Sequence, residues 1–188
     1  MVLRIPLDSN SLVPTLYTYF LSTASFRVRI LLNLKQLTYR KKFVNISKGE
    51  HLGSTLFPFQ VIPALKIDGV TLTESMAIAQ YLEDTRPEPP LLPVDPLAKC
   101  KVLQICHQVN ANIQPLQNLR VKKKLLEMSA GKIDVNEWSK HWNEVGFEGL
   151  ETMLVETSGK FCYGDTLTMA DAWVFAQTYN ARTRFGVD

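Results

Sequence analysis

The sequence predicts a protein of two parts, an α/β layer with one mixed sheet over residues 15–84 and an all-helical bundle over residues 97–188. In the first part, short segments rich in β-branched and aromatic residues alternate with segments of helical periodicity. In the second part, apolar residues recur at helical spacing and no strand pattern appears. Residues 85–96 contain five prolines. Because proline continues neither a helix nor a central strand, we expect this segment to be a linker.

The elements of the first part are expected in the order β-α-β, loop, β-β, α. Their predicted bounds are 15–19, 24–35, 41–44, 64–67, 70–72 and 75–83. Asp68-Gly69, between two short apolar runs, predicts a hairpin, since both residues tolerate a positive φ. Ser75 is predicted to be the N-cap of the last helix. A β-α-β unit followed by a hairpin and a helix favours one mixed four-stranded sheet.

The helical part is expected to pack along apolar stripes. One stripe, at helical spacing, consists of Val102, Ile105, Cys106, Val109 and Ile113. A second consists of Phe147, Leu150 and Leu154. Thr168 and Asp171 then have the spacing of a capping box, so a further helix is predicted to begin there. We expect both of these residues to be structural rather than catalytic.

Composition and charge exclude several classes of protein. With 46% hydrophobic and 21% charged residues, the balance is that of an ordinary globular protein. No apolar run reaches the roughly 18 residues needed to cross a bilayer, so no membrane partner is expected. Residues 1–14 are expected to form an N-terminal extension, since they lack the apolar core of a secretory signal. The basic runs 40–42 and 122–124 are only three residues long, which favours solvated faces over a nucleic-acid contact.

The cysteines and histidines show no ligand spacing. Cys100, Cys106 and Cys162 include no Cys-x-x-Cys pair. This pattern favours neither a disulfide framework nor a zinc site, and it is typical of a reducing compartment, which we expect to be the cytoplasm. His51, His107 and His141 are not at metal-ligand spacing either, so no metal site is expected.

Small hydroxyl residues gather where the first strand turns into the first helix. Ser22 and Thr23 lie at this point, where free backbone N–H groups and the positive end of the helix dipole meet. Such residues can donate hydrogen bonds to a thiolate. Lowering the pKa of a thiol from about 8.5 by about two units requires roughly 2.7 kcal/mol of preferential stabilisation, which one charge-assisted hydrogen bond and a helix terminus can supply. The alternative is that either residue merely caps the helix.

Two further pairs of residues complete a peptide-binding pattern. Pro63 at the start of a strand allows a cis bond after Ile62, which would turn the Ile62 backbone towards a peptide-like ligand. Ser75 can bind a carboxylate together with the free N–H groups of its helix, or simply cap that helix, and Glu74 can meet an ammonium group. A thiol site, a backbone clamp and a carboxylate-plus-amine site match the functional groups of glutathione.

These segments resemble the glutathione transferases, specifically the zeta class, whose members are also known as maleylacetoacetate isomerases. The resemblance runs from about residue 15 to residue 188. It is carried by Y-T-Y-F-L-S-T-A-S-F-R-V-R at 17–29, V-I-P-A-L-K-I-D-G-V-T-L-T-E-S-M-A-I at 61–78, Y-L-E-D-T-R-P-E-P-P-L-L-P at 81–93, I-Q-P-L-Q-N-L at 113–119, Y-G-D-T-L-T-M-A-D at 163–171 and R-F-G-V-D at 184–188. The S-x-x-S-F-R-V-R and I-Q-P-L-Q-N segments are specific to the zeta class.

The resemblance implies the glutathione transferase fold, with an N-terminal thioredoxin-like domain, a C-terminal helical domain and a homodimer. It also implies roles for the residues singled out above. Ser22 falls on the serine that stabilises the thiolate, and Thr23 on a second serine that positions it. Ile62 falls on the residue whose backbone clamps the cysteinyl part of glutathione. Glu74 and Ser75 fall on the pair that holds the γ-glutamyl end.

The resemblance adds four residues outside these motifs. Gln114 and Asn118 match residues of the helical domain that line the site. Arg184 matches an arginine that meets the substrate carboxylate. His51 is the nearest counterpart of a glutamine that contacts the glycine end of glutathione.

The sequence departs from the family at three places. Ala24 stands where the family has a cysteine that touches the site. The loop 48–60 is shorter than in the family, and its ending, where the family has N-P-x-x-x-V-P, reads F-P-F-Q-V-I-P at 57–63. The chain stops at residue 188, where the family continues for about one or two more helices, so we expect the helical domain to lack them.

The expected function is glutathione-dependent cis-trans isomerisation of maleylacetoacetate, a small acidic substrate of phenylalanine and tyrosine catabolism. Conjugation of glutathione to small α-haloacids is an expected side activity. The alternative is a glutathione transferase-like protein that binds or assembles without catalysis, which the three departures favour, since a fold does not fix a function. A disulfide oxidoreductase of the thioredoxin type is disfavoured because the first helix contains no cysteine.

Overall fold

The computed structural model describes residues 13–187. The chain divides into two compact units, Met1–Pro89 and Pro90–Asp188, and the division lies within the proline-rich segment 85–96. The predicted N-terminal extension, residues 1–14, lies outside the described residues except for its last two. The two units are described separately.

The first unit contains a four-stranded mixed sheet in the order β2-β1-β3-β4. β1 pairs in parallel with β2 and antiparallel with β3, and β3 pairs antiparallel with β4. The strands are β1 (Thr15–Thr18), β2 (Arg40–Phe43), β3 (Ala64–Ile67) and β4 (Val70–Thr73). The central strands are buried at Leu16 and Leu65, whereas β2 is exposed throughout and carries the charged residues that protect a sheet edge. Asp68 and Gly69 have φ of 50° and 79°, as the predicted hairpin requires.

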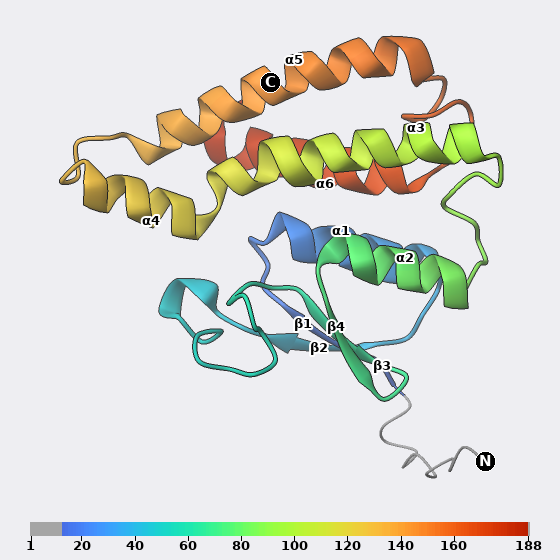
Figure 1. The fold of residues 1–188 in the computed structure, drawn as a ribbon, viewed down its shortest axis with the longest axis horizontal. Helices are drawn as coiled ribbons and strands as arrows, with labels where there is room; N and C mark the ends of the chain where they lie inside the picture. The colour runs from blue at the N-terminus through green and yellow to red at the C-terminus, as the bar shows by residue number, and fades with distance from the viewer. Residues whose placement is uncertain (1–12, 188) are drawn as a thin grey trace. The chain divides into compact units, whose positions relative to one another are not determined.

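Two helices cover one face of this sheet (Figure 1). They are α1 (Thr23–Leu34) and α2 (Ser75–Thr85), and a short 3-10 helix, η2 (Ile46–Lys48), follows β2. The predicted apolar face of α1 is confirmed, because Val28, Leu31 and Leu32 are buried. Ile78 and Leu82 provide the buried face of α2. The sheet and its two helices therefore enclose one apolar core, as in the thioredoxin-like architecture that the sequence predicts.

The second unit is helical. Its elements are α3 (Pro96–His107), the π-helix η3 (Gln108–Ile113), the 3-10 helix η4 (Gln114–Gln117), α4 (Leu119–Met128), α5 (Val135–Thr157) and α6 (Met169–Phe185). The predicted stripe is confirmed, since Val102, Ile105, Cys106, Val109 and Ile113 are all exposed by 1% or less. In the described part of the chain, no strand of a sheet follows Pro90. Within that part, no helix combines the length and apolar character needed to cross a membrane.

A glycine sets the distance between α5 and the π-helix. A Cβ atom at Gly146 would lie 2.4 Å from Cγ1 of Ile113, which is closer than carbon atoms approach. Only glycine therefore allows α5 to pack against η3 at this distance. The contact places the segment that follows η3 directly beside α5.

The local structure departs from what the sequence predicted at two places. Ser75 is not the N-cap of α2 but its first helical residue, and the cap position belongs to Glu74, whose side chain makes no capping hydrogen bond. The reason is that the main chain leaves β4 through a left-handed turn at Glu74, with φ of 67°. The break between α3 and α4 was also not predicted. It is explained by Pro115, which lacks the N–H that a continuous α-helix would need.

Candidate active site

The first candidate residue, Ser22, is the N-cap of α1. Its backbone is extended, and its Oγ accepts a hydrogen bond from the Ser25 N–H at 3.1 Å. This bond uses a lone pair of the hydroxyl and leaves its proton available to a further acceptor. No acidic residue lies in the first turn of α1, so the positive end of the helix is not neutralised there. Capping the helix and donating to an anion are therefore compatible roles for Ser22.

The neighbours of Ser22 hold the turn between β1 and α1. Thr23 begins α1 and is buried, and Ala24 follows it. One Arg29 Nη donates to Thr18 Oγ1 at 2.8 Å and to the Tyr19 carbonyl oxygen at 3.2 Å. Burial lowers the pKa of the Arg29 guanidinium, and Tyr39 opposes this shift. Arg29 lies within the S-x-x-S-F-R-V-R motif, where the sequence predicted no role for it, and its hydrogen bonds hold this turn.

The second candidate, Ile62, precedes Pro63 through a cis peptide bond. The side chain of Ile62 is buried, in a cluster with Tyr19, Val44 and Phe57. Outside the β-ladders, no described residue forms a hydrogen bond with the Ile62 main chain. Its backbone N–H and carbonyl groups therefore keep their capacity to pair with a ligand.

The third candidate pair lies at the start of α2. Glu74 is exposed and has φ of 67° and ψ of 115°, a conformation that costs a non-glycine residue about 1–3 kcal/mol and is concentrated at functional sites. Ser75 is buried. The first turn of α2 contains no acidic residue, so the positive end of this helix can bind a carboxylate. Figure 1 shows α1 and α2 side by side with both N-termini at the same end of the layer.

His51 lies apart from these elements in the chain. It follows η2 in the turn-rich stretch 49–60, and it is half-buried. Phe57 lies near the end of the shortened loop that contains His51. Its side chain is buried, and its ring packs against the ring of Tyr17 with centroids 5.9 Å apart. This aromatic contact fixes the end of the loop.

In the second unit, the structure brings two predicted residues together. Gln114 Nε2 donates to Asn118 Oδ1 at 2.7 Å. Gln114 is the first residue of the 3-10 helix η4 and Asn118 directly follows its last residue, and both are partly exposed. The hydrogen bond leaves the side-chain carbonyl oxygen of Gln114 and the side-chain NH2 group of Asn118 available to another partner.

A buried polar network, which the sequence analysis missed, holds η4 in place. Asn143 Nδ2 donates to Gln117 Oε1 at 2.9 Å, and Gln177 Nε2 donates to Asn143 Oδ1 at 2.6 Å. Trp138 Nε1 also donates to the Leu116 carbonyl oxygen at 2.9 Å. Helices α5 and α6 thus fix the segment between Gln114 and Asn118. The available signal was Gln177, a polar residue that directly follows the apolar run 172–176 of the helix predicted to begin at Thr168.

Arg184 lies in the last turn of α6 and is exposed. Its guanidinium lies 5.4 Å from the centre of the Phe185 ring. The predicted capping box at the other end of α6 is confirmed. Asp171 Oδ2 accepts hydrogen bonds from the N–H and the hydroxyl of Thr168 at 2.7 and 3.0 Å, and its Oδ1 accepts one from the Cys162 N–H at 2.8 Å. These bonds place Asp171 in a structural role.

The cysteines do not form a reactive pair. Burial, helped by a hydrogen bond with Asp171, raises the pKa of the Cys162 thiol to about 12, so this thiol stays protonated at neutral pH. Cys106 is buried, and Cys100 is exposed. Within residues 13–187, no group of three or more histidine, cysteine or acidic side chains is arranged to hold a metal ion.

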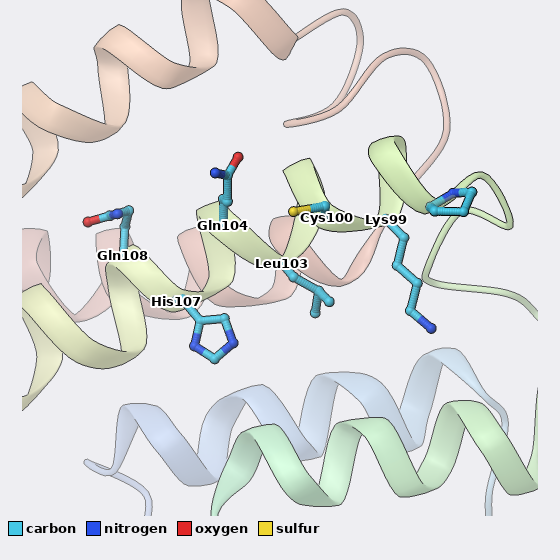
Figure 2. A pocket seen from close by; sticks show the side chains of 7 residues that line it. Lys99, Cys100, Leu103, Gln104, His107 and Gln108 are labelled. Carbon is cyan, nitrogen blue, oxygen red and sulfur yellow. The ribbon is translucent and has the colours of Figure 1, made fainter.

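A pocket lies along one helix of the second unit. Figure 2 shows that the labelled side chains around it project from α3 and from the first residue of η3. The lining consists of Pro96, Lys99, Cys100, Leu103, Gln104, His107 and Gln108. It contains none of the predicted site residues.

Comparison with known proteins places these features in a family. Residues 12–84 match the model of the glutathione S-transferase N-terminal domain. The first unit therefore has the fold of the glutathione-binding half of such transferases, and the predicted fold class is confirmed.

The similarity extends over most of the chain. A probable maleylacetoacetate isomerase 2 of Drosophila melanogaster is 42% identical over 186 residues, which is 96% of this chain and 79% of the relative. The maleylacetoacetate isomerase of Mus musculus is 43% identical over 180 residues, which is 93% of this chain and 81% of the relative. This chain therefore belongs to the zeta-class glutathione S-transferase and maleylacetoacetate isomerase family.

Solved structures agree with this family. The maleylacetoacetate isomerase from Anaeromyxobacter dehalogenans 2CP-1, with glutathione bound in its active site, is 36% identical with a TM-score of 0.82, over 94% of this chain and 83% of that one. A holo maleyl pyruvate isomerase, a bacterial zeta-class glutathione S-transferase, is 34% identical with a TM-score of 0.87, over 93% of this chain and 84% of that one.

Proposed function

We propose that this protein is a glutathione-dependent isomerase that converts maleylacetoacetate from the cis to the trans form. The observation that carries the proposal is the start of α1, where Ser22 caps the helix as an acceptor and keeps its hydroxyl proton. The identity to named maleylacetoacetate isomerases supports the substrate. The chemistry that glutathione supplies when bound is a sulfur nucleophile for reversible addition to the cis double bond.

The residues of the first unit fit a bound glutathione. Ser22 donates to the thiolate, which supplies about 1.5–3 kcal/mol as a charge-assisted hydrogen bond, and the N-terminus of α1 adds about 0.3–1 kcal/mol. Thr23 supports the position of this turn. The unpaired main chain of Ile62 receives the cysteinyl part. Ser75 and the N-terminus of α2 bind the γ-glutamyl carboxylate, and Glu74 meets the ammonium group.

The remaining assignments concern the glycine end and the substrate. His51 contacts the glycine end of glutathione. Gln114 and Asn118 line the substrate side of the site, and Arg184 meets a substrate carboxylate. In this proposal residues 15–84 are the glutathione-binding domain, residues 85–96 the linker and residues 97–188 the helical domain.

The biological setting follows from the same proposal. The protein acts as a homodimer in the cytoplasm on a small acidic substrate, within the breakdown of phenylalanine and tyrosine. A second activity is conjugation of glutathione to small α-haloacids. These assignments rest on the family resemblance.

A second candidate function is glutathione binding without catalysis. The observation that favours it is Ala24, which occupies the first turn of α1 where the family has a cysteine. An isomerisation assay separates the two functions. Purified protein with glutathione is expected to turn over a maleyl diketo acid, and the absorbance of that acid reports the reaction. Absence of turnover, with glutathione still bound in a calorimetric titration, would establish the binding protein instead.

The role of Ser22 has a separate test. Ser22→Ala should raise the pKa of bound glutathione and lower turnover about 10- to 100-fold, because one charge-assisted donor to the thiolate is lost. The affinity for glutathione should change little, since Ile62, Glu74 and Ser75 hold the peptide in both protonation states. Thiolate absorbance of the complex, followed against pH, measures this pKa. Thr23→Ala is the matched control, and a larger pKa shift in that variant would assign the thiolate contact to Thr23.

A further inference from the structure

Two cations of the second unit share one aromatic ring. Lys122 Nζ lies 5.2 Å from the centre of the Phe185 ring, and the Arg184 guanidinium lies 5.4 Å from the same centre. Lys122 belongs to α4 and Arg184 to the last turn of α6. Two helices that are distant in the sequence therefore bring two positive charges to one place.

No acidic side chain neutralises this pair among residues 13–187. The ion pairs found there use other cations, and neither Lys122 nor Arg184 has a further partner. On the same helix, Lys124 pairs with Glu127 at 2.9 Å. Lys122 is half-buried, and burial lowers the pKa of its ammonium, with the charge of Arg184 acting in the same direction. A half-buried cation beside a like charge is stabilised by a bound anion.

Lys122 also lies one helical turn beyond a predicted site residue. Its N–H donates to the Asn118 carbonyl oxygen at 3.0 Å, and residues four apart on a helix share one face. Asn118 in turn accepts the hydrogen bond from Gln114. The lysine therefore continues the polar face that begins at η4.

We propose that Lys122 binds a carboxylate of the substrate together with Arg184, so that the helical unit holds a two-cation site for a dianionic ligand. This inference rests on the function proposed above and deepens it. A maleyl diketo acid carries a carboxylate at each end, and two cations match that charge. Arg184 offers a planar fork of donors, whereas Lys122 offers a compact charge that can approach from another direction.

Matched substitutions on one helix test the proposal. Lys122→Met removes the charge and keeps an apolar side chain of similar length on the Phe185 ring. Lys123→Met removes the same charge from an exposed neighbour on α4. The probes are glutathione and dicarboxyethyl glutathione, which carries two carboxylates on its sulfur substituent, titrated by calorimetry.

We expect Lys122→Met to weaken the binding of dicarboxyethyl glutathione about tenfold or more, since a charge-assisted contact is lost. In Lys122→Met the affinity for glutathione should change less than about twofold. In Lys123→Met the affinities for glutathione and for dicarboxyethyl glutathione should both change less than about twofold. Lys122→Arg should retain most of the affinity for the conjugate. Equal weakening of both ligands by Lys122→Met, or no weakening of either, would overturn the proposal and assign Lys122 to packing against Phe185.

The isomerase function can fail independently of this site. If the protein turns over a maleyl diketo acid and Lys122→Met leaves its KM unchanged, the two-cation site is wrong and the isomerase stands. If turnover is absent but Lys122→Met selectively weakens the conjugate, the anion site stands and the isomerase is wrong. If Lys122→Met fails to fold, Lys122→Gln in the same titrations replaces it, with the same expectation.

Discussion

In the first unit the candidate residues are positioned by the main chain, whereas in the second they are positioned by buried side chains. Ser22 is fixed as a helix cap, and Glu74 by a left-handed backbone turn. Gln114 begins the short 3-10 helix η4 and Asn118 follows its end, and the hydrogen bonds of Asn143 hold this helix in place. The peptide-binding side should therefore tolerate most side-chain changes around it. The substrate side should be sensitive to a single buried substitution.

The strongest test of this contrast removes the centre of the network. Asn143→Ala should lower the free energy of unfolding by about 3 kcal/mol, because it leaves buried groups of Gln117 and Gln177 without partners. Urea unfolding measures the change. Asn136→Ala, at an exposed position of the same helix, should cost less than about 0.5 kcal/mol. If the two variants are equally stable, the network does not hold the segment.

A second test addresses the start of α6. Asp171→Ala should lower the free energy of unfolding by about 2 kcal/mol, since it removes a helix cap and the bond to the Cys162 N–H. Asp171→Asn, which keeps the shape of the side chain, should cost about half as much. The affinity for glutathione should stay within about twofold in either variant that folds. A selective loss of affinity at normal stability would contradict the structural role of this residue.

The sequence predicted most of the first unit because its signals are local. Residues 64–67 were predicted with the observed bounds, and the Asp68-Gly69 turn follows from backbone preferences alone. The start of α6 was predicted for the same reason, since Thr168 and Asp171 lie three residues apart. Each of these structures is predicted by a pattern that spans only a few consecutive residues.

The missed features depend on contacts between distant segments. The network joins Gln117, Asn143 and Gln177, which are 26 and 34 residues apart along the chain, and no local pattern pairs them. The paired cations on Phe185 likewise come from separate helices. Ser75 was placed at the wrong position of its helix because serine is a favoured cap, whereas the structure uses a left-handed backbone at Glu74 instead.

The smallest expected effect separates backbone from side chain at Glu74. Glu74→Gly should raise the free energy of unfolding by about 0.5–1 kcal/mol. Glycine adopts a positive φ without the strain that glutamate bears, and this gain exceeds the extra conformational entropy that glycine loses on folding. The same variant should weaken glutathione binding about tenfold, since the carboxylate for the ammonium group is lost. Thermal unfolding and calorimetry measure the two effects.

Two controls complete this last test. Gln36 has φ of 54° just beyond the C-terminus of α1 and is exposed. Gln36→Gly should therefore give a similar gain in stability, about 0.5–1 kcal/mol, with no change in glutathione affinity. Glu74→Gln keeps the backbone requirement and removes the charge, so it should weaken binding without changing stability. If Glu74→Gly neither stabilises the protein nor weakens glutathione binding, the turn at Glu74 is not strained for the sake of the ligand. The claim that the main chain positions the candidate residues of the first unit would then be wrong.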